Sequence, residues 1–366
     1  MTVPTRTRPH LGARLENAVM GRIADVLRRF GWHPLAVPYT GYGSAPADDQ
    51  GWVRVLMRVK LSPPRTDPQD ESSEDDEGGR WWRKFFTVGL GDVPVTVRVG
   101  DRVHEVSSGR GGYIDAVLAS DLTPGWHEVP VRVEGRPAAT ADLRVVGPDE
   151  RLGLISDIDD TVMVTALPRP LLAFWNTFVV KETSRRPVPG MAALYGRLRE
   201  PEPDALVVYL STGAWNVARA ISRFLERHDY PRGPLLMTDW GPTNDGWFRS
   251  GRDHKHRELR RLVGDLPQLR WVLVGDDGQH DPQLYEDLAG EVPQSLRMVL
   301  IRQLSAVEQV LTHGSPLPPP NQSQALNAPS PVPWLRGTDG AALTAQLEQA
   351  RPSSEKPSSG KPSSGT

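Results

Sequence analysis

The stretch Leu152-Gly-Leu-Ile-Ser156, followed directly by Asp157-Ile-Asp-Asp-Thr161, decides the fold of this chain. The first five residues are almost wholly apolar, and the next five carry three carboxylates and a hydroxyl. A short continuous apolar run is typical of a strand buried on both faces of a parallel sheet. Polar residues directly after such a strand lie at the sheet edge where open α/β folds bind ligands. The stretch therefore predicts a buried parallel strand with a polar site at its carboxyl end.

Three further apolar runs follow the same pattern, at Ala205–Leu210, Trp271–Val274 and Arg297–Ile301. Apolar residues at helical spacing separate most of these runs, as in Val217, Ala220, Ile221, Phe224 and Leu225. Fully apolar strands that alternate with helices predict an α/β fold, with a Rossmann-like parallel sheet covered by helices on both faces. We place this domain at residues 148–314, after a junction near Gly147-Pro148.

The part of the chain before this junction predicts β structure instead. Short alternating runs such as Val95–Val99 and Val129–Val133 are separated by Gly, Asp and Pro turn signals, without helical patterns between them. We therefore expect a small all-β antiparallel sandwich at residues 51–147. An acidic segment at residues 62–80 has almost nothing to bury and is predicted to be a disordered loop.

The two ends of the chain predict little folded structure. Residues 1–50 are expected to hold one amphipathic helix, with apolar residues at helical spacing between Leu15 and Phe30, and a loop. Residues 315–366 are rich in Pro, Ser and Asn, which predicts a mostly disordered tail with one short helix near Gly340–Arg351. Neither end carries residues that suggest catalysis.

The composition of the 366 residues limits the function classes. The absence of cysteine excludes disulfides, a thiolate nucleophile and a cysteine-based metal site. The formal net charge of -2 excludes a global basic field, so we expect no nucleic-acid partner. The apolar stretch Thr161–Val180 contains Pro168, Arg169 and Pro170, which would break a membrane-spanning helix. With no signal peptide at its start, the chain is expected to be cytoplasmic, and its excess of arginine over lysine indicates a GC-rich bacterial genome.

Polar residues at the predicted strand ends form a candidate site. Asp157 and Asp159 point the same way because they are two residues apart, and their repulsion needs a cation or a shared proton. Ser211-Thr212-Gly213 follows the second strand and offers hydroxyl and backbone donors at a helix start, which suits a phosphate. Lys255 opens the helix before the third strand, which ends in a second carboxylate cluster, Gly275-Asp-Asp-Gly-Gln-His-Asp281.

Each of these residues by itself has an ordinary structural explanation. Asp157 and Asp159 alone would be turn and helix-cap residues, and Ser211-Thr212 alone would be a helix start. Lys255 alone would be a surface lysine, and Asp276-Asp277-Gly278 alone would be a turn. All four sets occur in order, at the ends of apolar strands or the start of a helix, and this combination favours one shared phosphate site.

This set of motifs resembles that of the haloacid dehalogenase-like phosphatases. In particular it resembles the family of actin-patch-associated phosphatidate phosphatases, which are similar to the lipins. The resemblance covers roughly residues 150–305 and includes a preceding β domain; its further hallmarks are Arg185–Gly190 with Tyr195, Tyr209–Asn216, Arg232–Leu236 and Val274–Asp281. The chain departs from the family at Gly213-Ala214, where Ser-Pro is usual, and at Asp277, where Ser is usual.

The resemblance implies a mechanism and a cofactor. Asp157 attacks phosphorus and forms an aspartyl-phosphate, while Asp159 protonates the leaving alkoxide and then activates the hydrolytic water. Mg²⁺ is held by the Asp157 carboxylate, the Asp159 main-chain carbonyl and Asp276, and it relieves the repulsion between carboxylate and phosphate.

The resemblance also implies how the phosphoryl group is held. Ser211, Thr212 and Gly213 bind its oxygens, and Lys255 offsets charge in the transition state. Three further residues support the site. Asp281 orients Lys255 or a metal-bound water, Asp277 adds negative charge near the metal, and Thr161 completes the first motif.

The segment between the first two motifs bears on the substrate. Val162–Pro203 leaves room for a small hairpin flap and a helix but no large cap domain, and an open site suits a bulky or surface-presented substrate. The apolar residues of the flap either pack on the sheet or form a rim that meets acyl chains; they are Leu171, Leu172, Phe174, Trp175 and Phe178. The main hypothesis is a phosphorylated lipid substrate, most simply phosphatidate, with peripheral membrane contact.

Two other functions stay open at this point. One is a phosphatase that acts on a phosphoprotein or on nucleic-acid ends, and the other is a non-catalytic binding protein with a retired phosphatase domain. The intact Asp157, Asp159, Lys255 and Asp276 argue against retirement, and the low basicity argues against nucleic acid. The sequence gives no indication of the oligomeric state.

Overall fold

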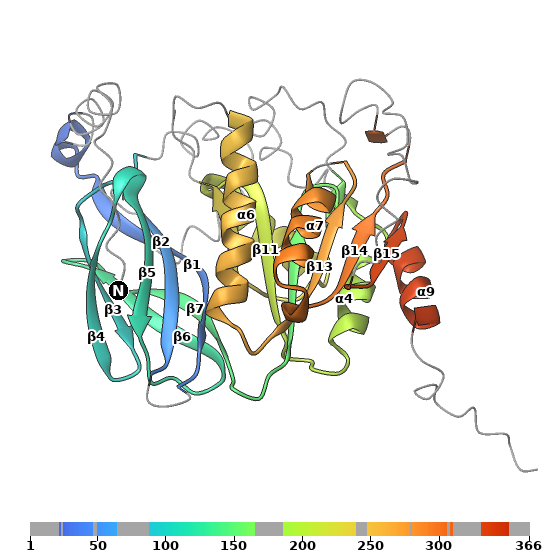
Figure 1. Ribbon diagram of the computed structural model, residues 1–366. Helices are drawn as coiled ribbons and strands as arrows, with labels where there is room; N and C mark the ends of the chain where they lie inside the picture. Colours follow the sequence, from blue (N-terminus) through green and yellow to red (C-terminus); the bar gives the residue numbers. More distant parts are fainter. Residues whose placement is uncertain are drawn as a thin grey trace, which may run out of the picture. The chain divides into compact units, whose positions relative to one another are not determined.

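The computed structural model describes residues 22, 25–46, 50–63, 88–164, 186–238, 247–278, 280–305, 308–309 and 331–350. The predictions for most of the acidic loop, the middle of the flap, Gln279 and most of the tail lie outside these residues. The chain divides between Pro148 and Asp149 into two compact units, next to the junction expected from the sequence. Each unit has its own sheet (Figure 1).

The first unit is built on one mixed sheet of seven strands in the order β4-β3-β6-β7-β1-β2-β5. Neighbouring strands are antiparallel except β1 and β7, which run parallel. Alternating valines of β3 enter the apolar core of this unit while its polar residues face outward. The strands are β1 (His33–Ser44), β2 (Trp52–Ser62), β3 (Pro94–Val99), β4 (Arg102–Ser107), β5 (Tyr113–Ala119), β6 (Gly125–Val133) and β7 (Ala139–Val146).

This sheet differs from the predicted β domain in two respects. It includes a parallel pair, β1 with β7, and its strand β1 lies within residues 1–50, which we expected to hold a helix and a loop. Two prolines and two glycines in β1 look like turn signals in the sequence. The glycines are needed because a Cβ on Gly41 or Gly43 would lie 2.2 Å from a backbone oxygen of β2. Residues 25–29, within the expected amphipathic helix, are helical.

The second unit contains a parallel sheet of six strands in the order β12-β11-β8-β13-β14-β15. Counted along the chain this order is 3-2-1-4-5-6, the order of doubly wound dinucleotide-binding folds. The prediction of an α/β fold with a parallel sheet is confirmed, and the four predicted apolar runs are strands. The strands are β8 (Leu152–Asp157), β11 (Leu206–Ala214), β12 (Leu235–Thr238), β13 (Arg270–Asp276), β14 (Leu296–Arg302) and β15 (Trp334–Gly337).

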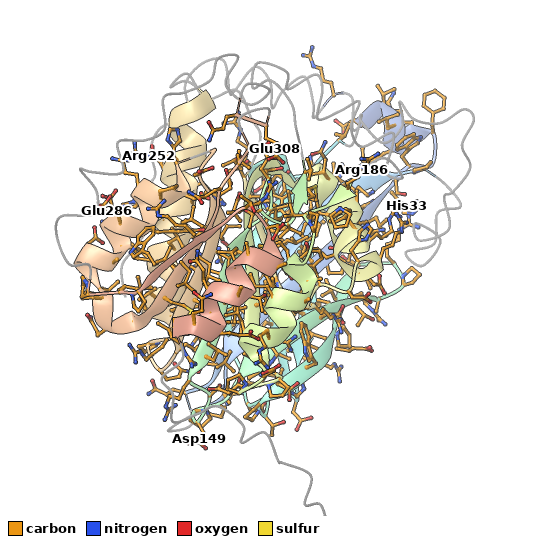
Figure 2. The ribbon with its side chains drawn as sticks, turned by 90° about the vertical axis from the view of Figure 1, so that its right-hand side faces the viewer. His33, Asp149, Arg186, Arg252, Glu286 and Glu308 are labelled. Atoms are coloured by element: carbon orange, nitrogen blue, oxygen red, sulfur yellow. The ribbon has the colours of Figure 1, made fainter. Side chains whose placement is uncertain are left out.

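Helices cover both faces of this sheet. Figures 1 and 2 show α6 (Trp247–Asp265) and α7 (Asp281–Glu291) on one face, joined where Arg260 Nε donates to Glu291 Oε2 at 2.8 Å. On the other face α4 (Met191–Arg199) lies beside α9 (Gly340–Ala350), and Arg197 and Glu348 are 3.5 Å apart across the pair. The remaining long helix, α5 (Ala218–Arg227), buries the apolar stripe that the sequence predicted for it.

Two short elements bear on the predicted flap and tail. β9 (Met163–Val164) pairs antiparallel with β10 (Arg186–Pro187), as the two ends of a hairpin do, while residues 165–185 lie outside the described residues. The short helix predicted near Gly340–Arg351 is confirmed as α9, but the strand before it was not expected in the tail, because β15 extends the parallel sheet. Their buried apolar side chains are Val332, Leu335, Leu343 and Leu347.

The stretch Thr161–Val180, which the sequence excluded as a membrane span, is described only as far as Val164. No helix of the described part of the chain combines the length and the apolar content that a membrane crossing needs.

Candidate active site

The predicted site residues meet at the carboxyl ends of the central strands. β8 lies between β11 and β13, so the strand order reverses beside it, which is where doubly wound folds bind ligands. Asp157 ends β8 opposite Leu210 of β11, and Asp276 ends β13 opposite Arg302 of β14. Figure 2 shows Arg186, Arg252 and Glu308 at this end of the second unit and Asp149 at the opposite end.

A buried cluster of charged side chains forms the centre of the site. Oxygen atoms of Asp157, Asp276 and Asp281 lie within 4.8 Å of one another, and all three residues are buried. Lys255, on α6, lies between two of them, with its Nζ 2.6 Å from Asp157 Oδ1 and 2.8 Å from Asp281 Oδ1. One ammonium group faces three carboxylates, so the cluster keeps an excess of negative charge.

The protonation of these groups follows from burial and from their mutual charges. Burial raises the pKa of Asp157 well above its ordinary value, the charges of Asp281 and Asp159 raise it further, and Lys255 opposes the rise. Burial likewise raises the pKa of Asp276, with added repulsion from Asp281 and Asp157. Burial alone would lower the pKa of Lys255, but the charges and hydrogen bonds of Asp157 and Asp281 raise it. Lys255 is therefore cationic, and the carboxylates need more positive charge to ionise together.

The donor set fits a divalent metal ion with oxygen ligands. Asp157 Oδ2 and Asp281 Oδ2 are buried, and neither has a hydrogen-bond partner within the described part of the chain. Asp276 is held by two donors, the backbone N–H of Gly278 at 2.7 Å and the hydroxyl of Thr161 at 3.4 Å. Carboxylate oxygens are the ligands that Mg²⁺ prefers, and a divalent cation would offset the excess negative charge.

The first two motifs meet on the β11 side of the cluster. Ser211 is buried at the end region of β11, and its hydroxyl donates to Asp159 Oδ2 at 3.3 Å. The backbone N–H of Gly213 donates to Ser211 Oγ at 3.0 Å, which fixes the rotamer of the serine. The hydroxyl of Thr238, on β12, donates to the carbonyl of Thr212 at 2.8 Å. The Ser211-Thr212-Gly213 segment is therefore held beside Asp159.

The structure also gives contacts for the supporting residues. Asp281 pairs with Lys255, one of the two partners that the resemblance implied for it. Asp277 has a different contact from the one expected. Its Oδ1 accepts a hydrogen bond from the backbone N–H of Leu304 at 2.7 Å, and burial raises its pKa. Asp277 thus fastens the segment after β14 to the segment after β13.

Sequence reasoning missed several side chains that bind the backbone of the first motif. The hydroxyl of Ser156 donates to the carbonyl of Asp157 at 2.6 Å and also contacts the hydroxyl of Tyr195. The hydroxyl of Tyr230 donates to the carbonyl of Val162 at 2.9 Å. Arg302 is buried and donates to the carbonyl of Asp160 at 2.7 Å. A signal for Arg302 was present, since a charged residue directly follows the apolar run of β14.

Comparison with known proteins places the matched segment in the second unit. Residues 152–303 match the family model of the catalytic domain of phosphatidate phosphatase APP1. Phosphatidate phosphatase APP1 of Saccharomyces cerevisiae is 24% identical over 152 residues, which are 41% of this chain and 26% of that protein. An uncharacterized protein of Schizosaccharomyces pombe is 21% identical over 154 residues, which are 42% of this chain and 25% of that protein. The chain thus spans about a quarter of the length of these curated relatives.

These matches confirm the predicted resemblance to phosphatidate phosphatases for residues 152–303. Both relatives are yeast proteins and give no support to the expected bacterial origin. A solved carbohydrate esterase structure aligns with 87% of this chain and 98% of its own, at 10% identity and a TM-score of 0.21, which is too low to bear on fold or function. β15 and α9 lie outside the matched residues.

Proposed function

We propose that this chain is a Mg²⁺-dependent phosphatase with the haloacid dehalogenase topology, which hydrolyses a lipid phosphate, most simply phosphatidate. The observation that carries the proposal is the buried cluster of Asp157, Lys255, Asp276 and Asp281 at the carboxyl edge of the parallel sheet. A buried group of carboxylates around one lysine is costly to keep for structure alone, because each unpaired buried charge is destabilising. Such a cluster is typical of a site that binds a cation and a phosphate.

In the proposed reaction Asp157 is the nucleophile. An oxygen of its carboxylate forms a bond to phosphorus while the bond from phosphorus to the substrate alkoxide breaks, and Asp159 gives that alkoxide its proton. Asp159 then takes a proton from water, which attacks the aspartyl-phosphate and releases inorganic phosphate and free Asp157. Lys255 favours the ionised form of Asp157, from which its ammonium nitrogen lies 2.6 Å away.

The remaining residues have binding roles in this proposal. Asp157, the main-chain carbonyl of Asp159, and Asp276 would hold Mg²⁺, which offsets the repulsion between the nucleophile and the phosphate when bound. The hydroxyl of Ser211, the neighbouring Thr212 and Gly213, and the ammonium of Lys255 would bind the phosphoryl oxygens. Ser211 already contacts Asp159, so phosphate binding and proton transfer would share one edge of the site.

The lipid substrate is supported by the similarity of this chain to phosphatidate phosphatase APP1 of yeast and to the family model of its catalytic domain. The apolar residues of the flap are the second support. They include Phe174 and Trp175 and occur in a segment too short for a large cap domain. A peripheral contact with the membrane surface would bring this segment to the substrate.

A phosphate-release assay with Mg²⁺ tests the proposal directly. The substrates are phosphatidate vesicles, short-chain soluble phosphatidate, a phosphopeptide and end-phosphorylated DNA, with Asp157→Asn as the inactive control. We expect turnover of both phosphatidate forms and little turnover of the other two. Turnover of the phosphopeptide or the DNA alone would contradict the lipid substrate, and Mg²⁺-independent turnover of any of them would contradict the mechanism.

A further inference from the structure

Arg302 is a buried arginine at the carboxyl end of β14, outside every motif of the proposed site. The residue is 4% exposed, and each of its three side-chain nitrogens contacts an oxygen. Nη1 donates to the carbonyl of Asp160 at 2.7 Å, and Nε donates to the carbonyl of Thr338 at 3.2 Å. Nη2 donates to the carboxylate of Glu308 at 2.6 Å. Figure 2 shows Glu308 at the same end of the unit as the candidate site.

The Asp160 carbonyl belongs to a strained part of the first motif. Asp160 has a φ of 56°, in the left-handed region that residues other than glycine rarely adopt. Its backbone N–H donates to the carbonyl of Met163 at 2.9 Å, which closes a tight loop after Asp159. A left-handed aspartate costs about 1 kcal/mol and persists only where its surroundings hold it. The bond from Arg302 holds the carbonyl side of this residue, and the bond to Met163 holds its amide side.

Arg302 also contacts the other carboxylate loop through its backbone. It is the register partner of Asp276, and its carbonyl accepts a hydrogen bond from the N–H of Asp277 at 3.0 Å. One residue therefore contacts the loop that carries Asp159 and the loop that follows Asp276. The residues on either side of Asp160 are Asp159, which contacts Ser211, and Thr161, which contacts Asp276.

We propose that Arg302 is a positioning residue of the site. By holding the carbonyl of Asp160, it keeps the 157–164 loop in the conformation that directs Asp159 toward Ser211 and Thr161 toward Asp276. The role of Arg302 in catalysis rests on the proposed function. Its effect on the conformation of the 157–164 loop does not. Glu308 pairs with the buried guanidinium of Arg302, so the positive charge of Arg302 is neutralised where it lies.

The test compares backbone hydrogen exchange between the wild-type chain and its variants, each full length and without added metal. Exchange is measured by mass spectrometry on the peptide that covers residues 157–164. We expect Arg302→Gln to speed the exchange of this peptide roughly tenfold or more, since a hydrogen bond from a charged donor contributes about 1.5–3 kcal/mol. Arg302→Lys should restore part of the protection. The matched control is Arg270→Gln, which removes an arginine-to-carbonyl bond, to Leu296, at the other end of β13.

A kinetic measurement then links the loop to the reaction. With a soluble phosphate ester and Mg²⁺, we expect Arg302→Gln to lower kcat at least about tenfold with a smaller change in KM, and Arg270→Gln to change neither. Unchanged exchange at residues 157–164, or a rise spread evenly over the whole sheet, would overturn the proposal. A wild-type chain without activity would contradict the proposed function only. Hydrogen exchange would still test whether Arg302 holds the 157–164 loop.

A second variant covers the case in which Arg302→Gln does not fold. Glu308→Gln leaves Arg302 itself unchanged but removes the carboxylate that pairs with its guanidinium, so it weakens the hold of Arg302 on the Asp160 carbonyl. We expect a smaller increase in exchange, confined to the same peptide. No increase there would count against the proposal.

Discussion

At the scale of single residues, Asp157 is proposed both as the nucleophile and as a metal ligand. One substitution can remove both roles while leaving the fold intact. Its ionised form is disfavoured by burial and by neighbouring carboxylates, so replacing it with a neutral side chain of the same shape costs the fold little. We expect Asp157→Asn to abolish phosphate release while the melting temperature stays within a few degrees of wild type. Asp159→Asn should retain metal binding and slow turnover by roughly 10²–10⁴-fold, the usual contribution of general acid–base catalysis. Phosphate release above trace levels in Asp157→Asn would exclude an aspartyl-phosphate.

Gly275 offers a second test because a side chain there would reach the cluster. A Cβ on Gly275 would lie 2.7 Å from Asp281 Oδ2 and 2.9 Å from the ring of Tyr285. We expect Gly275→Ala to displace Asp281, weaken its pairing with Lys255 and lower turnover, with a loss of roughly 1–3 kcal/mol in the free energy of unfolding. Gly196→Ala is the matched control, since a Cβ there meets nothing within 4 Å and alanine favours the helix by about 1 kcal/mol. Equal turnover in the two variants would contradict the role given to Asp281.

At the scale of elements, the accuracy of sequence reasoning depended on how each strand is buried. β8, β11, β13 and β14 were predicted within one to four residues, because strands covered on both faces read as continuous apolar runs. β1 was missed because its prolines and glycines suggested turns. β15 was missed because it is four residues long and lies in a Pro-rich context. Its partners β14 and α9, rather than its own sequence, stabilise it.

The candidate site, too, could be predicted from the sequence only in part. Residues of the motifs could be predicted because a strand end fixes where its side chains point, and the structure does bring Asp157, Lys255, Asp276 and Asp281 together. The contact between Asp277 and Leu304 could not be predicted, since it depends on the path of the segment after β14. Contacts between loops that follow different strands depend on three-dimensional packing, which spacing along one chain does not encode.

The importance of β15 and α9 can be tested by truncation. A chain that ends at Ala350 keeps both elements, and we expect its melting temperature and activity to match the full chain. A chain that ends before residue 331 exposes the β14 edge and the apolar surface under Leu343 and Leu347. Each buried leucine contributes roughly 1.5–3 kcal/mol, so we expect this shorter chain to melt many degrees lower or not to fold. Equal thermal unfolding of the two chains would show that the predicted tail adds nothing to the domain.

The flap prediction concerns residues outside the described part of the chain, so it rests on the sequence. If Phe174 and Trp175 meet lipid, changing both to Ser should lower activity on phosphatidate vesicles much more than on a soluble ester. Burying one large apolar side chain in lipid is worth roughly 1.5–3 kcal/mol, so two changes should weaken docking by orders of magnitude. Equal loss on both substrates, with a lower melting temperature, would show that these residues pack inside the flap.

At the scale of the whole molecule, the two units have separate apolar cores and only the second carries the carboxylate cluster. The core of the first unit is formed by residues between Ala36 and Val145, together with partly buried residues such as Leu27. Asp157, Asp276 and Asp281 all lie after the division at Pro148. A ligand of the cluster should therefore stabilise the second unit and leave the first unchanged, which makes metal binding visible without an activity assay.

Calorimetry of the full chain with and without Mg²⁺ measures this difference. A ligand at one hundred times its dissociation constant stabilises the folded state by about 2.7 kcal/mol, and each kcal/mol shifts a unit of this size by roughly 2–4 °C. We expect Mg²⁺ to raise one transition by about 5–10 °C, with EDTA reversing both the shift and the activity. Residues 149–366 expressed alone identify which transition belongs to the second unit.

Asp276→Asn should lose the shift that Mg²⁺ produces, because it removes a carboxylate that would hold the metal. Ca²⁺ should produce a shift without supporting turnover, since its longer bonds and higher coordination number would draw Asp157 out of line for attack. A shift in the other transition, or full activity in EDTA, would exclude a metal site built from Asp157 and Asp276.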